Sequence, residues 1–143
     1  MGGIVEHKKR IQEHIQEIND AIDIGIEKRP ATIGFHTSAC AVELLEVLLH
    51  KLNMISSGKM IKHNWFVRPK KEQKILPLIE RKLPVVFDDK EKVYELIYSV
   101  EENRDTLIYA KSTRNQIETT LNSFVALREI IEKKLQELGE KID

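Results

Sequence analysis

The segment of residues 39–52 constrains the fold more than any other part of the chain, because apolar residues occupy nearly every helical face of it. A helix that is apolar almost all round is surrounded by protein rather than by water. We therefore predict a central helix over residues 31–52. The small residues near its start would let a neighbouring helix approach closely; they are Gly34, Ser38, Ala39 and Ala41.

Three further long segments have the pattern of helices that cover this one. In residues 4–28 isoleucines recur three, four or seven positions apart, which places them on one helix face, and Pro30 ends the run. Residues 89–110 and 112–139 show a similar periodicity, and each follows a capping signal. These capping signals are Asp88 with Glu91 and Thr113 with Gln116.

A shorter helix is predicted over residues 70–83, where Pro77 should kink it. No segment alternates strictly enough to be a strand. The economical arrangement is an all-α fold, an antiparallel up-and-down four-helix bundle with an additional short kinked helix. Its 143 residues form one domain, 1–143.

The composition narrows the class of protein. The 23 basic and 23 acidic side chains cancel, which excludes a uniformly basic nucleic-acid coat and an acidic disordered tail. The single cysteine, Cys40, excludes an intramolecular disulfide and indicates a reducing compartment. We find no secretory signal and no apolar run long enough to span a membrane, so we expect a cytoplasmic protein. Abundant Lys and Glu are typical of thermophile proteins.

Basic and aromatic residues gather between residues 59 and 74, and only Glu72 opposes their charge. Cations interleaved with aromatic rings can hold phosphates and stack bases. The alternative is a solvated loop whose tryptophan plugs the end of the bundle. The candidate RNA- or phosphate-binding residues are Lys59, Lys62, His63, Trp65, Arg68, Lys70, Lys71 and Lys74, with Lys111 from a later connection.

Arg104 interrupts an apolar row in residues 89–110, at a position where an inward-facing side chain is expected. A buried arginine requires a partner. Arg104 therefore either pairs with Glu101, one turn earlier, or lines a cleft or a subunit interface.

The five histidines show no metal-binding pattern. A di-iron bundle needs Glu-x-x-His on two helices, and this spacing does not occur. His7 and His14 share a helix face, and Glu46 and His50 are four residues apart. We interpret the histidines as surface or capping residues, and no metal or cofactor is predicted.

Three segments resemble HEPN domains. The sequence GFHTSACAVELL at residues 34–45 is similar to the second HEPN helix, and residues 58–66 are similar to the loop after it. The sequence ENRDTLIY at residues 102–109 resembles the HEPN signature of an arginine, a polar residue and then a histidine. The resemblance implies a helical bundle that often forms a homodimer. It also implies either metal-independent RNA cleavage, or nucleotide binding or pairing with a nucleotidyltransferase, as in a toxin–antitoxin-like pair.

The chain departs from the HEPN signature at its last position. Arg104 and Asp105 match, but Tyr109 stands in place of the histidine. A tyrosine with a pKa near ~10 is a poor acid or base at neutral pH. We therefore favour a non-catalytic or weakly active module that binds RNA, a nucleotide or a partner protein through these three residues. The alternatives are a metal-independent ribonuclease that recruits His63, with Lys111 or Tyr109 assisting, and a purely structural protein-interaction bundle.

Overall fold

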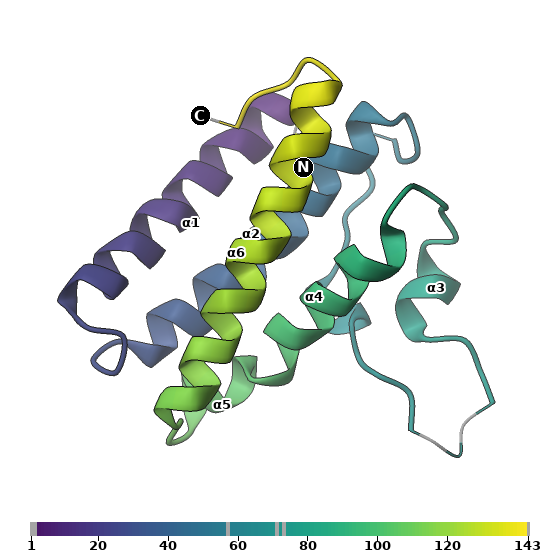
Figure 1. Ribbon diagram of the computed structural model, residues 1–143. Helices are drawn as coiled ribbons and strands as arrows, with labels where there is room; N and C mark the ends of the chain where they lie inside the picture. The colour runs from purple at the N-terminus through teal and green to yellow at the C-terminus, as the bar shows by residue number, and fades with distance from the viewer. Residues whose placement is uncertain (1–2, 57, 71, 73, 143) are drawn as a thin grey trace.

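The computed structural model describes residues 3–56, 58–70, 72 and 74–142, and these residues form helices and loops without a strand. The long helices α1 (Ile4–Ile24), α2 (Pro30–Lys51), α4 (Lys90–Glu102) and α6 (Arg114–Glu137) pack as a bundle (Figure 1). The prediction of an all-α antiparallel bundle is confirmed. The short elements are α3 (Leu78–Lys82), α5 (Arg104–Tyr109) and the 3-10 turn η1 (His63–Trp65).

Helix α2 occupies the centre, as predicted. It contacts α1, α4, α5 and α6. Its leucines and most of its other apolar side chains are buried, including Ile33, Leu44, Leu45, Leu48 and Leu49, which are fully enclosed. Burial of one such side chain contributes roughly 1.5–3 kcal/mol, so α2 supplies much of the hydrophobic stabilisation.

By length and composition alone, α2 is apolar enough to cross a membrane, so the prediction that no segment is long enough to do so does not hold for this helix. However, 72% of its most apolar stretch is buried inside the protein. Burial of this extent is typical of a core helix, so the hydropathy of α2 is explained by the packing within the bundle.

The predicted helix over residues 70–83 is wrong in its first half. Pro77 is not a kink inside the helix but the residue before its first turn, and α3 has only five residues. Because Pro77 lacks an N–H and restricts the residue before it, the chain remains non-helical up to this point at the described positions. Lys71 lies outside the described residues.

The capping predictions had different outcomes. At the start of α6, Thr113 and Gln116 form the predicted capping box. At the start of α4, the N-cap is Asp89 in a left-handed conformation (φ 65°), with no side-chain cap bond, so the predicted box of Asp88 and Glu91 is wrong. Helix α1 ends at Ile24 rather than residue 28, because Gly25 leaves the helix at φ 129°.

The predicted single helix over residues 89–110 is divided at Asn103, and its second part, α5, packs on α2. Gly34 allows this contact. A Cβ atom at Gly34 would lie 2.8 Å from Cβ of Leu107 and 3.2 Å from the backbone oxygen of Arg104. The absence of a side chain at residue 34 therefore determines how closely the Arg104 backbone approaches α2.

We expect Gly34→Ala to destabilise the protein by about 1–3 kcal/mol, because the added methyl group overpacks this contact. Alanine otherwise stabilises a helix by about 0.5–1 kcal/mol relative to glycine, so a loss would report the clash. Chemical denaturation measures the change. Gly58→Ala is the control, because the space around Gly58 is open. Equal or greater stability of Gly34→Ala would contradict the described contact.

Candidate functional site

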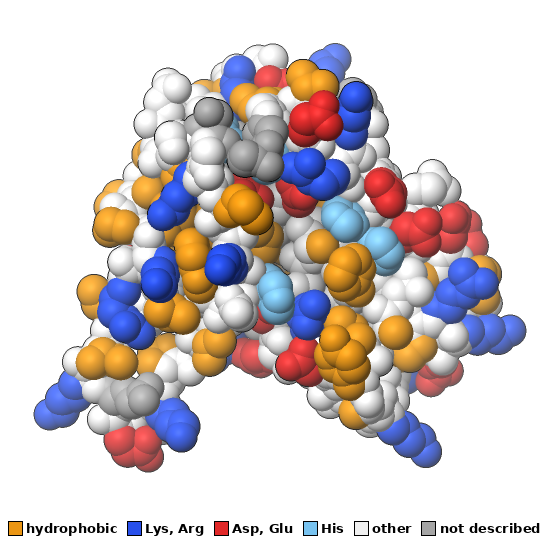
Figure 2. All heavy atoms as spheres, turned by 180° about the vertical axis from the view of Figure 1, so that it is seen from behind, with side chains coloured by type: hydrophobic (Ala, Val, Ile, Leu, Met, Phe, Trp, Pro, Cys, Tyr) orange, Lys and Arg blue, Asp and Glu red, His pale blue; other side chains and the backbone are white. Residues whose placement is uncertain are grey.

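A polar seam runs along the contact between α1 and α2. Its residues recur at intervals of seven, with His7 and His14 on α1 and His36, Glu43 and His50 on α2. The two helices run antiparallel, so the rings pair in reverse order. His14 Nδ1 is 2.8 Å from His36 Nδ1, and the His7 and His50 rings are 5.5 Å apart. The face shown in Figure 2 carries histidine side chains among hydrophobic ones.

In the middle of the α2 row of this seam, Glu43 accepts hydrogen bonds from two residues of α1. His7 Nδ1 lies 2.5 Å from Glu43 Oε1, and Arg10 Nε donates to Glu43 Oε2. The hydrogen bond to Glu43 raises the pKa of Arg10. His7 is only 3% exposed, so the interpretation of every histidine as a surface or capping residue is wrong for His7.

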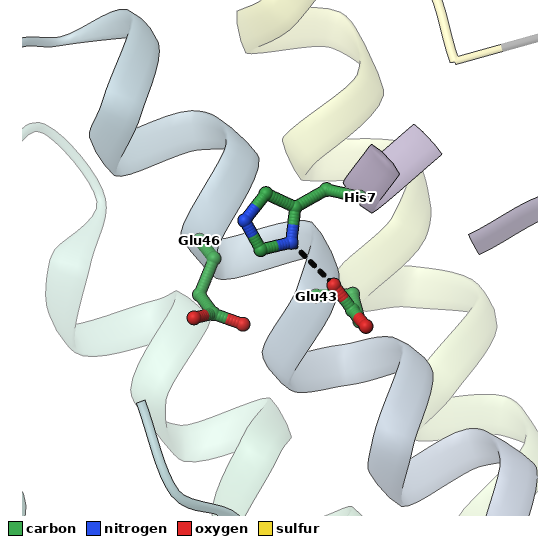
Figure 3. A group of neighbouring side chains, drawn as sticks. All are labelled: His7, Glu43 and Glu46. Atoms are coloured by element: carbon green, nitrogen blue, oxygen red, sulfur yellow. Dashed lines mark hydrogen bonds and ion pairs between the residues drawn. The ribbon is translucent and has the colours of Figure 1, made fainter. Parts of the chain in front are cut away.

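Glu46 lies one turn after Glu43 and is 6% exposed. Its Oε2 accepts a hydrogen bond from the backbone N–H of Ile61, and burial raises the pKa of the carboxyl group. Figure 3 shows the side chains of His7, Glu43 and Glu46 close together between α1 and α2. Glu43 and Glu46 also line a hollow of about 340 Å³, bounded by Ala39, Val42, Met60, Ile61, Lys62, His63 and Asn64.

A second polar cluster lies where α2, α4 and η1 meet. Glu101 of α4 accepts a hydrogen bond from Ser38 Oγ, and its other oxygen lies 2.8 Å from His63 Nδ1. The side chain of Glu101 is only 8% exposed. Ser38 and His63 each contact the carboxylate rather than one another, so the cluster is not a nucleophile–histidine–carboxylate triad. It orients the partly exposed His63 ring.

Arg104 is the first residue of α5, and its side chain is 16% exposed. Its ion pair is with the exposed Asp105, 2.9 Å away, whereas Glu101 contacts Ser38 and His63. The suggested pair with Glu101 is therefore wrong. The Nε atom of Arg104 is buried and, among the described residues, has no hydrogen-bond partner. A mostly buried guanidinium group is thus incompletely satisfied.

Tyr109 of the predicted signature and the candidate residue Lys111 are more exposed to solvent than Arg104. Tyr109 is 78% exposed, and Lys111 just after α5 is also exposed. No hydrogen bond joins Tyr109 to Arg104 in the described part of the chain. The structure thus brings Asp105 to Arg104 and leaves Tyr109 and Lys111 facing solvent.

The basic stretch is less available for phosphate than the sequence predicts. Arg68 makes hydrogen bonds to Glu95 and to Glu102, lies 5.0 Å from the Tyr98 ring centre, and has its pKa raised by the bonds to Glu95 and Glu102. These carboxylates come from α4, so a count of local charge could not include them. Figure 2 shows Lys and Arg side chains interspersed with hydrophobic ones. The exposed lysines of the stretch include Lys62, Lys70 and Lys74.

Trp65 is partly buried and packs against the core, as the alternative interpretation of this loop predicts. Lys59 lies 5.7 Å from the centre of its ring, which is a cation–π contact. The indole face is therefore already occupied in part, and the candidate residue Trp65 acts first as an anchor of the loop.

Comparisons of the chain with protein-family models, with curated proteins and with solved structures find no match. The resemblance to HEPN domains consequently remains a prediction from the residues themselves.

We expect the stability of the protein to decrease as the pH falls from about 7.5 to 5.5. Burial, and then the neighbouring His36, lower the pKa of His14, so the fold favours its neutral form. The stability that neutral His14 contributes is fully present above the ordinary histidine pKa. It is lost as the pH falls towards the lowered pKa of His14 in the folded protein. Thermal melting across this range should show a weaker pH dependence for His14→Gln. Parallel curves for the two proteins would contradict this assignment.

Proposed function

We propose that this chain is a HEPN-like binding module for a phosphate-bearing ligand, with RNA as the favoured ligand, and that Arg104 is its principal contact. The observation that carries the proposal is the state of the guanidinium group, which is mostly buried and has an unpartnered Nε among the described residues. An unmade hydrogen bond to a buried group costs about 1–3 kcal/mol. An anionic oxygen from a ligand would remove this cost.

A phosphate suits this position because a guanidinium group can donate two parallel hydrogen bonds to it. Asp105 neutralises only one side of the group, through a single nitrogen at 2.9 Å. Its own side chain is exposed, so it orients Arg104 without enclosing it. The exposed ring of Tyr109 provides a surface on which a base can stack.

We further propose that the module acts as a cytoplasmic homodimer or with a nucleotidyltransferase partner, as the HEPN resemblance implies. Arg104 and Tyr109 point differently along α5, since five residues correspond to about 140° of helix rotation. In a dimer, Arg104 of one chain and Tyr109 of the other would contact the same ligand, and a partner protein would serve in the same way. The exposed lysines, such as Lys62 and Lys74, would attract the phosphate backbone.

Arg104→Met should weaken the binding of single-stranded RNA by roughly 10–150-fold, the equivalent of a lost hydrogen bond to a charged group. Methionine keeps the length and apolar contacts of the side chain, so thermal stability should be equal or higher. Arg128→Met is the matched control, because it removes the same charge from an arginine on α6 that is paired with Glu132. Fluorescence anisotropy measures binding, and sedimentation gives the solution mass relative to the 16.6 kDa chain. If Arg104→Met binds RNA as tightly as the unmodified protein and forms an assembly of the same size, Arg104 contacts neither the ligand nor a second subunit, and the proposal is refuted.

A metal-independent ribonuclease is the second candidate, because Glu101 holds His63 through Nδ1 and leaves Nε2 available to a substrate. If this candidate is correct, RNA cleavage in the presence of EDTA should fall by about 10²–10⁴-fold in His63→Asn. Cleavage that His63→Asn and Arg104→Met leave unchanged would show a contaminating nuclease and exclude this candidate. Binding without cleavage would leave the binding module as the function.

A further inference from the structure

We infer that His7, Glu43 and Glu46 form a binding site for a divalent transition-metal ion of the zinc class. One ligand atom from each side chain lies within 4.8 Å of the other two. Figure 3 shows the imidazole from α1 close to the two carboxylates from α2, with Nδ1 directed at Glu43 and the Glu46 carboxylate on the other side of the ring. This site is separate from Arg104 and does not depend on the proposed function.

The donor set fits the chemistry of zinc. Zinc is bound by histidine nitrogen and carboxylate oxygen at about 2.0–2.2 Å, with three protein ligands and an open fourth position in sites that hold water. Tetrahedral donors at that distance lie about 3.4 Å apart. His7 Nδ1 and Glu43 Oε1, at 2.5 Å, would have to separate by about one ångström to admit the ion. The proton on His7 Nδ1 would also have to leave, because a metal binds the free lone pair of an imidazole nitrogen.

The backbone presents these ligands on rigid elements. Glu43 and Glu46 are three residues apart in the middle of α2 and therefore share a helix face. His7 comes from α1, which packs along α2. A metal ion would thus join two helices whose relative position the core already determines, which reduces the entropy lost on binding.

Neighbouring groups already orient the ligands. The Ile61 N–H donates to Glu46 Oε2 and leaves Glu46 Oε1 for a metal. Arg10 contacts both oxygens of Glu43 and lies 3.1 Å from His7 Nδ1, so its guanidinium group would have to shift to Oε2 alone when the ion enters. Such outer contacts are the usual support of a metal site. Two acidic side chains face one guanidinium group in this cluster, so a divalent cation would find carboxylate oxygens in excess there.

Two further observations indicate a ligand here rather than an ordinary ion pair. The hollow of about 340 Å³ adjoins two of the three proposed ligands, Glu43 and Glu46, and has room for a bound water. His50 packs its ring 5.5 Å from that of His7, and its Nε2 is buried with no partner in the described chain. A second imidazole with unused hydrogen-bonding capacity therefore adjoins the proposed ligands.

The test uses the full chain after removal of metals with a chelator. Titration calorimetry with Zn²⁺ should give one ion per chain, and Co²⁺ should develop the visible absorption of a tetrahedral complex. A 100-fold excess of zinc over its dissociation constant should raise the melting temperature by roughly 5–10 °C. Glu46→Gln should lower the zinc affinity by more than about 100-fold, a larger loss than outer contacts usually cause.

Glu46→Gln is the decisive variant because glutamine can still accept the hydrogen bond from Ile61, so the fold should persist without metal. His7→Gln is the second ligand variant, and circular dichroism reports whether each remains helical. The double variant His14→Gln with His36→Gln is the control, since it removes two other histidines of the same seam. Full zinc affinity in Glu46→Gln, loss of binding only in the double variant, or no binding by the unmodified chain would each overturn the inference.

Discussion

The burial of α2 on all sides is the constraint on which the rest of the structure depends. This helix is not purely apolar, because Ser38 and Glu46 are buried within it and Glu43 is mostly covered. Buried polar groups must be hydrogen-bonded, so the elements that lie against these side chains supply their partners. Helix α1 supplies His7 and Arg10 to Glu43, α4 supplies Glu101 to Ser38, and the loop before η1 supplies the Ile61 N–H to Glu46. The elements that bury the apolar side chains of α2 therefore also supply the hydrogen bonds that its buried polar side chains need.

The division of residues 89–110 at Asn103 has a comparable effect on Arg104. In one continuous helix, Glu101 and Arg104 would share a face and could pair. Here Glu101 turns to α2 and η1, whereas α5 packs against Gly34 and carries Arg104 with Asp105 as its ion-pair partner. Arg104 therefore lacks Glu101 as a partner, and among the described residues its Nε has no hydrogen-bond partner.

Periodicity predicted the fold well because it depends on which residues avoid water, and this property is local. The central helix and the four-helix bundle followed from it, and the capping box at Thr113 followed from the residue types at positions 113 and 116. The early end of α1, the short α3 and the break at Asn103 did not, because they depend on the backbone conformation at single residues, Gly25, Pro77 and Asn103, which the periodicity of apolar residues does not report. The seven-residue spacing of His7 and His14 was visible in the sequence. The row of His36, Glu43 and His50 on α2 could be matched to it only once the structure showed that the two helices pack together.

The amino-acid sequence by itself determined that the chain forms helices around an apolar centre and that Arg104 and Asp105 stand without the signature histidine. Only the tertiary structure decided which charges meet. Glu95 and Glu102 neutralise Arg68, and Glu43 and Glu46 converge with His7 from a helix more than thirty residues away. The physical reason is that hydrophobic burial depends on the composition of each segment, whereas a hydrogen bond or an ion pair needs two particular atoms within about 3 Å, which only the folded chain arranges.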